Sequence, residues 1–156
     1  MSPFRPFATS LILSSLVATH ADAGPDRISI LLGSEHVNAT RDFEEVNPGI
    51  FLHWTESLFR NRVDLSFGAF RNSYGDGSVA VATAYPVVRN EIWSFDIFTA
   101  LAWYPGNGDE FSHAIGDIVP IAGLQARYRN LFMQAIPAGG QSVDATLTFG
   151  LTFPLN

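Results

Sequence analysis

The chain has 156 residues, no cysteine and no lysine, and its nine arginines and fifteen acidic residues give a formal net charge of −6 at pH 7. This length suits one domain, and the absence of cysteine excludes a disulfide framework and a thiolate metal site. The acidic balance argues against a nucleic acid as partner.

The first 23 residues have the pattern of a secretory signal peptide. They contain a basic residue at Arg5, an apolar run over 7–17, and the small-x-small sequence Ala21-Asp22-Ala23. The apolar run is much shorter than the roughly 20 residues that a membrane-spanning helix needs. We therefore expect a signal peptide over 1–23 and one exported domain over 24–156. An exported chain without cysteine favours a bacterial envelope protein.

The rest of the chain alternates between apolar and polar residues, which is the period of a β-strand. The alternation is strictest near the C-terminus, where Val143, Ala145, Leu147, Phe149, Leu151 and Phe153 share one face. We predict eight strands, separated by residues typical of turns, at about 28–37, 43–54, 62–72, 78–88, 92–104, 117–127, 130–137 and 142–153. The predicted fold is all-β, an eight-stranded antiparallel up-and-down transmembrane β-barrel.

Alternation alone does not distinguish a soluble barrel, with its apolar face inside, from a membrane barrel, with that face outside. Several predicted strands have the roughly 9–11 residues needed to cross a bilayer, and short loops alternate with a long polar one at 105–116. Aromatic residues fall near strand ends, with Trp54, Tyr85, Trp93, Tyr128 and Phe153 on one rim and Phe43, Tyr74, Trp103 and Tyr104 on the other. These features favour a barrel in the bacterial outer membrane.

Strand order brings distant polar residues to one end of such a barrel. With both termini in the periplasm, the first and third strands end at the outer surface, so His36 is expected near Asn72 and Ser73. A histidine can act as general base for a serine, and an amide can orient the imidazole. The alternatives are a solvated histidine, a turn serine and an asparagine bonded to its own backbone. Regular alternation would turn His36 outward, so either His36 lies beyond the regular strand or a β-bulge turns it inward.

Several segments, in this order and spacing, resemble the PagP family of outer-membrane lipid A palmitoyltransferases. They are His36 with the acidic, aromatic segment 42–49, Ala69-Phe70-Arg71-Asn72-Ser73-Tyr74, Val119-Pro120-Ile121-Ala122-Gly123, and Phe132-Met133-Gln134-Ala135-Ile136-Pro137. The resemblance covers about 35–153. The family's amphipathic N-terminal helix has no counterpart, since only 24–27 precede the first strand.

The resemblance implies an enzyme that moves an acyl chain from a phospholipid to lipid A. The family's surface histidine, acid and serine correspond to His36, Asn72 and Ser73, so an amide stands where the family has an acid and cannot supply its negative charge. Pro120 and Pro137 match positions associated with lateral gaps through which lipid enters. The implied partners are a phospholipid and lipopolysaccharide within the outer membrane, and we expect a monomer.

Small residues on the inward parity predict a slot for an acyl chain. Gly68, Ala80, Ala82 and Ala84 have this parity, as do Ala100 and Ala102. The alternative is that the inward rings of Phe51, Phe70 and Phe98 fill the space. By resemblance, Ala84 occupies the position of the glycine that sets acyl length, which predicts a chain somewhat shorter than palmitate.

Two other functions remain open from the sequence. The first is a barrel that binds lipid without catalysing a reaction on it, and the amide of Asn72 in place of an acid favours this function. The second is a purely structural barrel. No phosphate-binding loop, zinc-protease motif or calcium loop occurs, so we expect neither a metal nor a cofactor.

Overall fold

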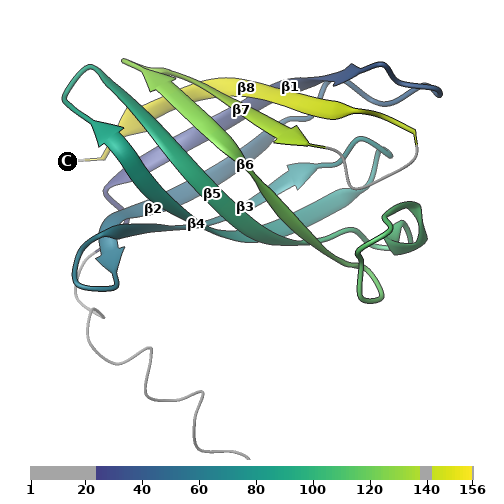
Figure 1. Ribbon diagram of the computed structural model, residues 1–156, viewed down its shortest axis with the longest axis horizontal. Coiled ribbons are helices and arrows are strands. Elements are labelled where there is room, and N and C mark those ends of the chain that lie inside the picture. The colour runs from purple at the N-terminus through teal and green to yellow at the C-terminus, as the bar shows by residue number, and fades with distance from the viewer. Residues whose placement is uncertain (1–23, 138–141, 156) are drawn as a thin grey trace, which may run out of the picture.

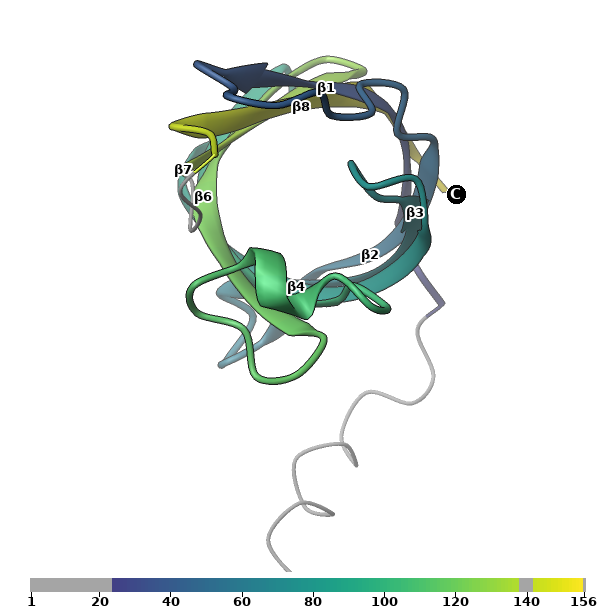
Figure 2. The ribbon, with the colours of Figure 1, turned by 90° about the vertical axis from the view of Figure 1, so that its right-hand side faces the viewer.

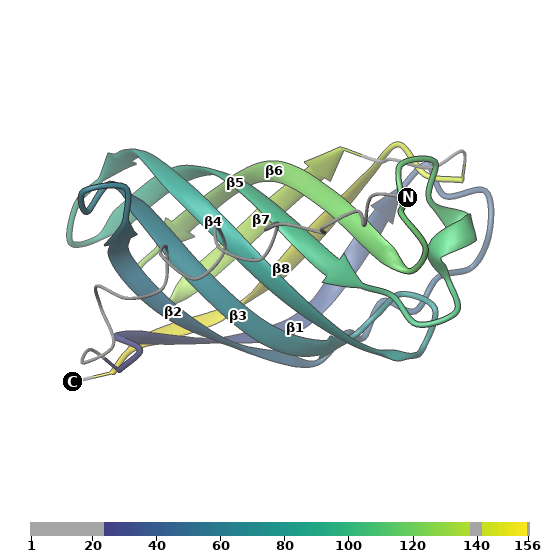
Figure 3. The ribbon, with the colours of Figure 1, turned by 90° about the horizontal axis from the view of Figure 1, so that it is seen from below.

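The computed structural model describes residues 24–137 and 142–155, and it shows a closed antiparallel barrel in which each strand pairs with its sequence neighbours and β8 pairs with β1 (Figures 1 and 3). The strands are β1 (Arg27–Val37), β2 (Gly49–Leu58), β3 (Val63–Arg71), β4 (Gly77–Arg89), β5 (Trp93–Trp103), β6 (Ile118–Tyr128), β7 (Leu131–Pro137) and β8 (Ala145–Pro154), with a 3-10 turn at Gly108–Glu110. This confirms the predicted eight-stranded antiparallel barrel. The predicted signal peptide lies outside the described residues.

The two ends of the barrel differ in their connections. The mouth, as we call the end where β1, β3, β5 and β7 finish, carries the long loops 38–48 and 104–117. The opposite end, which we call the floor, has short turns such as 90–92 and 129–130. Figure 2 looks into the mouth, with the 3-10 turn on its rim. In the described part of the chain, no helix has the length and apolar character needed to cross a membrane.

The distribution of polar and apolar residues is the reverse of that in a water-soluble domain. Among the described residues, eleven polar or charged side chains are buried but only six apolar ones. Large apolar side chains instead cover the outside, and many of them are about half exposed. Examples are Val81, Ile97, Leu101, Leu124, Leu131 and Phe149. The alternation of each strand therefore directs polar and small residues into the lumen and aliphatic and aromatic residues outward.

The second strand differs from its predicted bounds. We predicted 43–54, but β2 begins at Gly49 and continues to Leu58, four residues beyond the predicted end. Pro48 directly precedes the strand, and proline cannot donate a ladder hydrogen bond. The segment before it is a loop whose Asn47 is buried rather than part of an alternating strand.

Two of the eight ladders cover only the floor half of the barrel. Strand β1 pairs with β2 only over Arg27–Leu31, and β6 pairs with β7 only over Leu124–Tyr128. In contrast, β5 and β6 pair along their whole length, from Trp93 to Trp103 on β5. The barrel wall is thus unpaired at two places near the mouth.

Candidate functional site

His36 and Ser73 meet at the mouth, although 37 residues separate them in the sequence. The His36 Nε2 atom lies 3.0 Å from the Ser73 Oγ atom, which is hydrogen-bonding distance. The Nδ1 atom of His36 is buried and has no hydrogen-bond partner among the described residues. The ring of His36 stacks on Phe43, with centroids 4.4 Å apart and an angle of 16° between the planes. The predicted histidine–serine pair is therefore present, but no carboxylate orients the imidazole.

A β-bulge turns His36 into the lumen. The register between β1 and β8 shifts between Leu31 and Gly33, and beyond the shift Ser34 and His36 are both buried. Without the extra residue, alternation from the outward Ile30 would place His36 on the outer face. Of the two predicted possibilities, a position beyond the regular strand and a bulge, the structure shows the bulge, because His36 lies within β1.

Asn72 does not take part in this pair. It is only 1% exposed, and its amide nitrogen donates to the Ser78 hydroxyl over 3.0 Å. Its side-chain oxygen accepts hydrogen bonds from the backbone N–H groups of Tyr74 and Asp76, at 2.9 and 3.0 Å. All of these bonds stay within the β3–β4 turn, where Gly75 has a positive φ of 93°. The contacts therefore match the alternative in which Asn72 holds its own turn.

We expect Asn72→Ala to destabilise the barrel by about 1–3 kcal/mol, because it leaves two backbone N–H groups of the turn and the buried Ser78 hydroxyl without their partner. Asn72→Asp keeps the acceptor, so it should cost less, and it should not raise catalytic activity because position 72 does not contact His36. Unfolding in urea, measured beside any acyl-transfer assay, checks both statements. A rise in activity in Asn72→Asp would show that this side chain reaches the imidazole.

Aromatic rings from three loops pack over one side of the mouth. Tyr74 makes edge contacts with Phe43, Tyr104 and Phe111, and Tyr104 contacts Phe111 with centroids 4.9 Å apart. The guanidinium of Arg41 lies over Phe43 and Tyr74 and pairs with Glu110 at 2.8 Å. Phe43, Tyr74 and Tyr104 were predicted on an outward aromatic rim, but they contact one another here, because loops rather than strand faces carry them.

Burial in this aromatic cluster raises the pKa of the Tyr104 phenol well above its usual range, and burial also raises the pKa of Tyr74. Both tyrosines are therefore neutral at ordinary pH and keep their O–H donors. Together with Arg41, they give the mouth uncharged and cationic donors beside the histidine–serine pair.

Asn47 is a site residue that the sequence did not reveal. It is only 4% exposed and lines the lumen, where its side-chain oxygen accepts a hydrogen bond from the Ser34 hydroxyl. Its amide nitrogen is buried without a partner among the described residues. The loop that carries it is fixed on both sides, since Glu45 accepts from the Ser34 N–H and Glu44 donates to the Ser73 carbonyl. Asn47 therefore offers an unused donor in the same part of the lumen.

Below the mouth lies a cavity of about 850 Å³ that contains His36 and Ser73 in its lining. Its middle is apolar and made largely of small side chains from β4 and β5, with Phe98 and Val119 beside them. The small residues are Ala80, Ala82, Ala84, Ala100 and Ala102. Because Ala80 and Ala84 are four residues apart on one strand, the column is about 13 Å long at 3.3 Å per residue. The predicted slot is thus present along β4 and β5.

Gly68 faces the lumen as predicted but does not line this cavity. A side chain at Gly68 would meet the ring of Phe51 at 2.3 Å, so that ring already occupies the space above it. Phe51 stacks on Phe70 with centroids 5.9 Å apart. The aromatic residues therefore fill the β2–β3 side of the lumen, and the open column is confined to β4 and β5.

The residues that line the cavity come from both the inner and the outer face of the barrel wall. On β5 and β6 it contacts the inward residues Ala100 and Ile121 and also the outward residues Leu101 and Ala122. Such a cavity must pass through or over the wall, and the unpaired part of β6 and β7 is adjacent. Pro120 and Pro137 lie on these unpaired parts, are exposed, and line the cavity. Neither can donate a ladder hydrogen bond, so both help to keep the strands apart.

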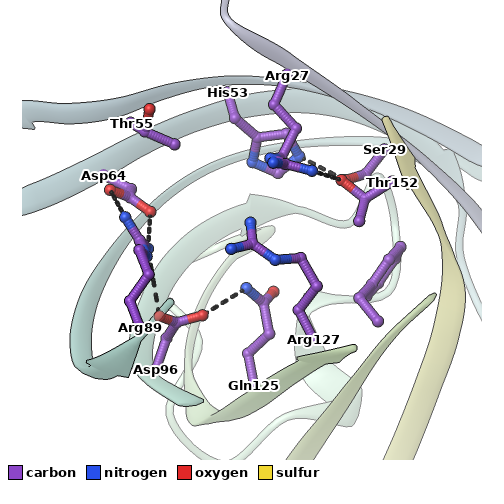
Figure 4. A pocket seen from close by; sticks show the side chains of 11 residues that line it. Arg27, Ser29, His53, Thr55, Asp64, Arg89, Asp96, Gln125, Arg127 and Thr152 are labelled. Atoms are coloured by element: carbon purple, nitrogen blue, oxygen red, sulfur yellow. Dashed lines mark hydrogen bonds and ion pairs between the residues drawn. The ribbon is translucent and has the colours of Figure 1, made fainter. Parts of the chain in front are cut away.

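A polar cluster closes the lumen at the floor (Figure 4). Arg89 from β4 pairs with Asp64 of β3 and with Asp96 of β5, where its nitrogen lies 3.3 Å from the carboxylate. Gln125 donates to Asp96 over 3.2 Å. Ala84 pairs with Asp64 in the ladder, so the apolar column ends where this cluster begins. The lumen therefore has a reactive pair at one end, an apolar middle and a charged floor.

Within the described residues, no group of three or more histidine, cysteine or acidic side chains is placed to hold a metal ion. What the site offers is a serine hydroxyl with a histidine base and a separate amide donor. No protein-family model and no curated protein matches this chain.

Proposed function

We propose that the chain is an outer-membrane barrel that transfers an acyl chain from a phospholipid to lipid A, with Ser73 as nucleophile and His36 as its base. The observation that carries this proposal is the 3.0 Å contact between His36 Nε2 and Ser73 Oγ, placed at the mouth of an apolar cavity of about 850 Å³. A volume of this size falls in the usual range for sites that bury a small ligand.

The outer surface supports insertion in a membrane. Outward residues in the middle of the strands are uncharged and mostly apolar, and the hydroxyls of the outward pair Thr83 and Thr99 bond to each other at 3.1 Å. Charged residues gather at the floor turns and in the mouth loops. The outward rings of Trp93 and Tyr128 are paired neighbours near the floor, where an interfacial aromatic residue is expected. An apolar surface that encircles the barrel is stable in lipid but would promote aggregation in water.

The unpaired wall between β6 and β7 supports entry of a lipid from the bilayer. A phospholipid in the outer leaflet has its acyl chains at the depth of the strands and its ester groups near the mouth. An acyl chain entering beside Pro120 and Pro137 reaches the alanine column, and its ester carbonyl then lies at the level of Ser73. The unused amide donor of Asn47 is available to the carbonyl oxygen, where negative charge develops during acyl transfer.

In the proposed reaction Ser73 attacks the ester carbonyl while His36 Nε2 takes its proton. A lysophospholipid leaves with that proton. His36 then takes the proton of a lipid A hydroxyl as this oxygen attacks the acyl-Ser73 ester, and the same proton returns to Ser73 Oγ as the acyl chain is transferred. The imidazolium has no carboxylate partner at Nδ1, so this base is less well supported than in a three-residue triad. We therefore expect slow turnover.

The same missing partner favours a second candidate, a barrel that holds an acyl chain without transferring it. The buried, unpaired Nδ1 atom of His36 is the specific observation behind this alternative. Both functions use the same cavity, so they differ only in chemistry.

A reconstituted assay distinguishes them. Purified protein in detergent micelles is given a phospholipid with a labelled acyl chain, together with lipid A. Acyl transfer predicts the label on lipid A and equimolar lysophospholipid. Retention of all label on the phospholipid, with saturable binding to the protein, would support the binding-only barrel.

Substitutions at Ala84 should change the preferred acyl length, because this residue lies where the alanine column meets the charged floor. Ala84→Gly should favour a chain longer by about one methylene, and Ala84→Met a chain shorter by several, with each buried methylene worth about 0.8 kcal/mol. Competition between phospholipids of graded chain length measures the preference. If the wild type and both variants prefer the same acyl length, the alanine column is only part of the packed interior and does not determine that length.

A further inference from the structure

The floor cluster distributes its charges unevenly. Asp64 and Asp96 both converge on Arg89, and Asp96 also accepts from Ser94 and Gln125. A third acid, Asp26, accepts two hydrogen bonds from Thr55. All three carboxylates are therefore engaged, and none lies within ion-pair distance of the two remaining guanidinium groups, those of Arg27 and Arg127.

These two arginines have few partners inside the barrel. Arg27 contacts the Thr152 hydroxyl at 3.4 Å, a long hydrogen bond, and its Nε atom is buried without a partner among the described residues. Arg127 makes no hydrogen bond or ion pair to any residue that the structure describes. Figure 4 shows its side chain reaching from β6 to the centre of the cluster, toward Arg27 and between Gln125 and His53. Both side chains are half-buried, and placing two such like charges together without ion-pair partners costs free energy that a nearby anion would reduce.

A small cavity of about 20 Å³ lies among these groups. One side of its lining is formed by Asp64 and Asp96 with their partner Arg89. The rest includes Arg27, Ser29, His53, Arg127 and Thr152. That space has room for one or two water-sized particles, which suits a monatomic anion. Both serine and threonine hydroxyls can donate to an anion. Hydrogen bonds of His53 to Ser29 and Ser66, at 2.7 and 2.8 Å, hold the imidazole in place on one side.

We infer that the floor of the barrel binds one monatomic anion of chloride size between Arg27 and Arg127. The anion offsets one of the two positive charges that the acids leave without an ion-pair partner, and it occupies the end of the lumen below the acyl column. This site is separate from the histidine–serine pair and does not depend on the proposed acyl transfer.

Thermal unfolding of the full chain in detergent micelles tests the site. At constant ionic strength, the melting temperature of the wild type should rise as sodium chloride replaces sodium gluconate. Arg127→Met removes one of the two like charges, so it should melt higher than the wild type in gluconate and should not respond to chloride. Arg62→Met, in the exposed β2–β3 turn at the same end, is the control and should respond like the wild type.

Two results would overturn the assignment. One is a wild type that is indifferent to chloride, and the other is an Arg127→Met protein that responds to chloride as the wild type does. Sodium phosphate should be no better than gluconate, and stabilisation by phosphate that depends on Arg127 would contradict a monatomic ligand. If Arg127→Met does not fold, bromide-soaked crystals of the wild type decide. An anomalous peak between Arg27 and Arg127 is expected, and its absence refutes the site.

Discussion

Replacing Ser73 by alanine is expected to lower acyl transfer to lipid A by about 10³-fold or more, because it removes the proposed nucleophile. His36→Gln should lower the rate by about 10²- to 10⁴-fold, the usual contribution of a general base. The double variant should be no slower than Ser73→Ala, since the two residues act as one unit. Release of lysophospholipid from the labelled donor gives the rates.

A histidine–serine contact on an exposed loop of the mouth serves as a matched control. His113 Nδ1 lies 3.0 Å from the Ser112 Oγ atom, but both residues are on the exposed long loop of the mouth. Ser112→Ala should leave the rate and the melting temperature unchanged. If Ser112→Ala lowered the acyl-transfer rate as much as Ser73→Ala does, the loss would come from disturbed mouth loops and not from removal of a nucleophile at Ser73.

An arginine at Ile97 is expected to destabilise the membrane-inserted barrel by about 2–4 kcal/mol, because this residue faces outward at the middle of β5. The side chain of Ile97 is 49% exposed, and that of Ile92, in the turn before the strand, is 50% exposed. In water the two substitutions would therefore have similar effects. In a bilayer, Ile92→Arg lies at the interface and should cost about 0–1 kcal/mol.

Urea unfolding in lipid vesicles measures both free energies. A difference between Ile97→Arg and Ile92→Arg that is present in vesicles supports insertion with β5 crossing the bilayer. Equal destabilisation of the two variants would contradict the membrane orientation, whatever the fate of the proposed chemistry.

The barrel and the meeting of His36 with Ser73 could be predicted because both follow from strand order and alternation. Eight alternating segments define an up-and-down barrel, and in such a barrel the ends of β1 and β3 lie at the same mouth. The parity of β1 also indicated that His36 either lies beyond the regular strand or follows a bulge. Likewise, the small residues of β4 and β5 could be placed inward from their period alone.

The rest depended on loops and on side-chain reach, which alternation does not determine. Asn47 follows no strand period, and its burial comes from the hydrogen bonds of the segment at Glu44 and Glu45. Asn72 could be placed at the mouth, but strand alternation does not determine whether its amide points toward His36 or into its own turn. Asp64 and Asp96 did carry a usable signal, since each is a charged residue at an inward position of an otherwise apolar strand.

The mass spectrum of lipid A from cells that produce the protein tests the proposed acyl transfer most directly. Cells with the wild type should contain lipid A that is heavier by one acyl chain, and cells with Ser73→Ala should not, at equal amounts of folded protein in the outer membrane. The added mass also gives the acyl length. Lipid A of identical mass in both strains would contradict the acyltransferase.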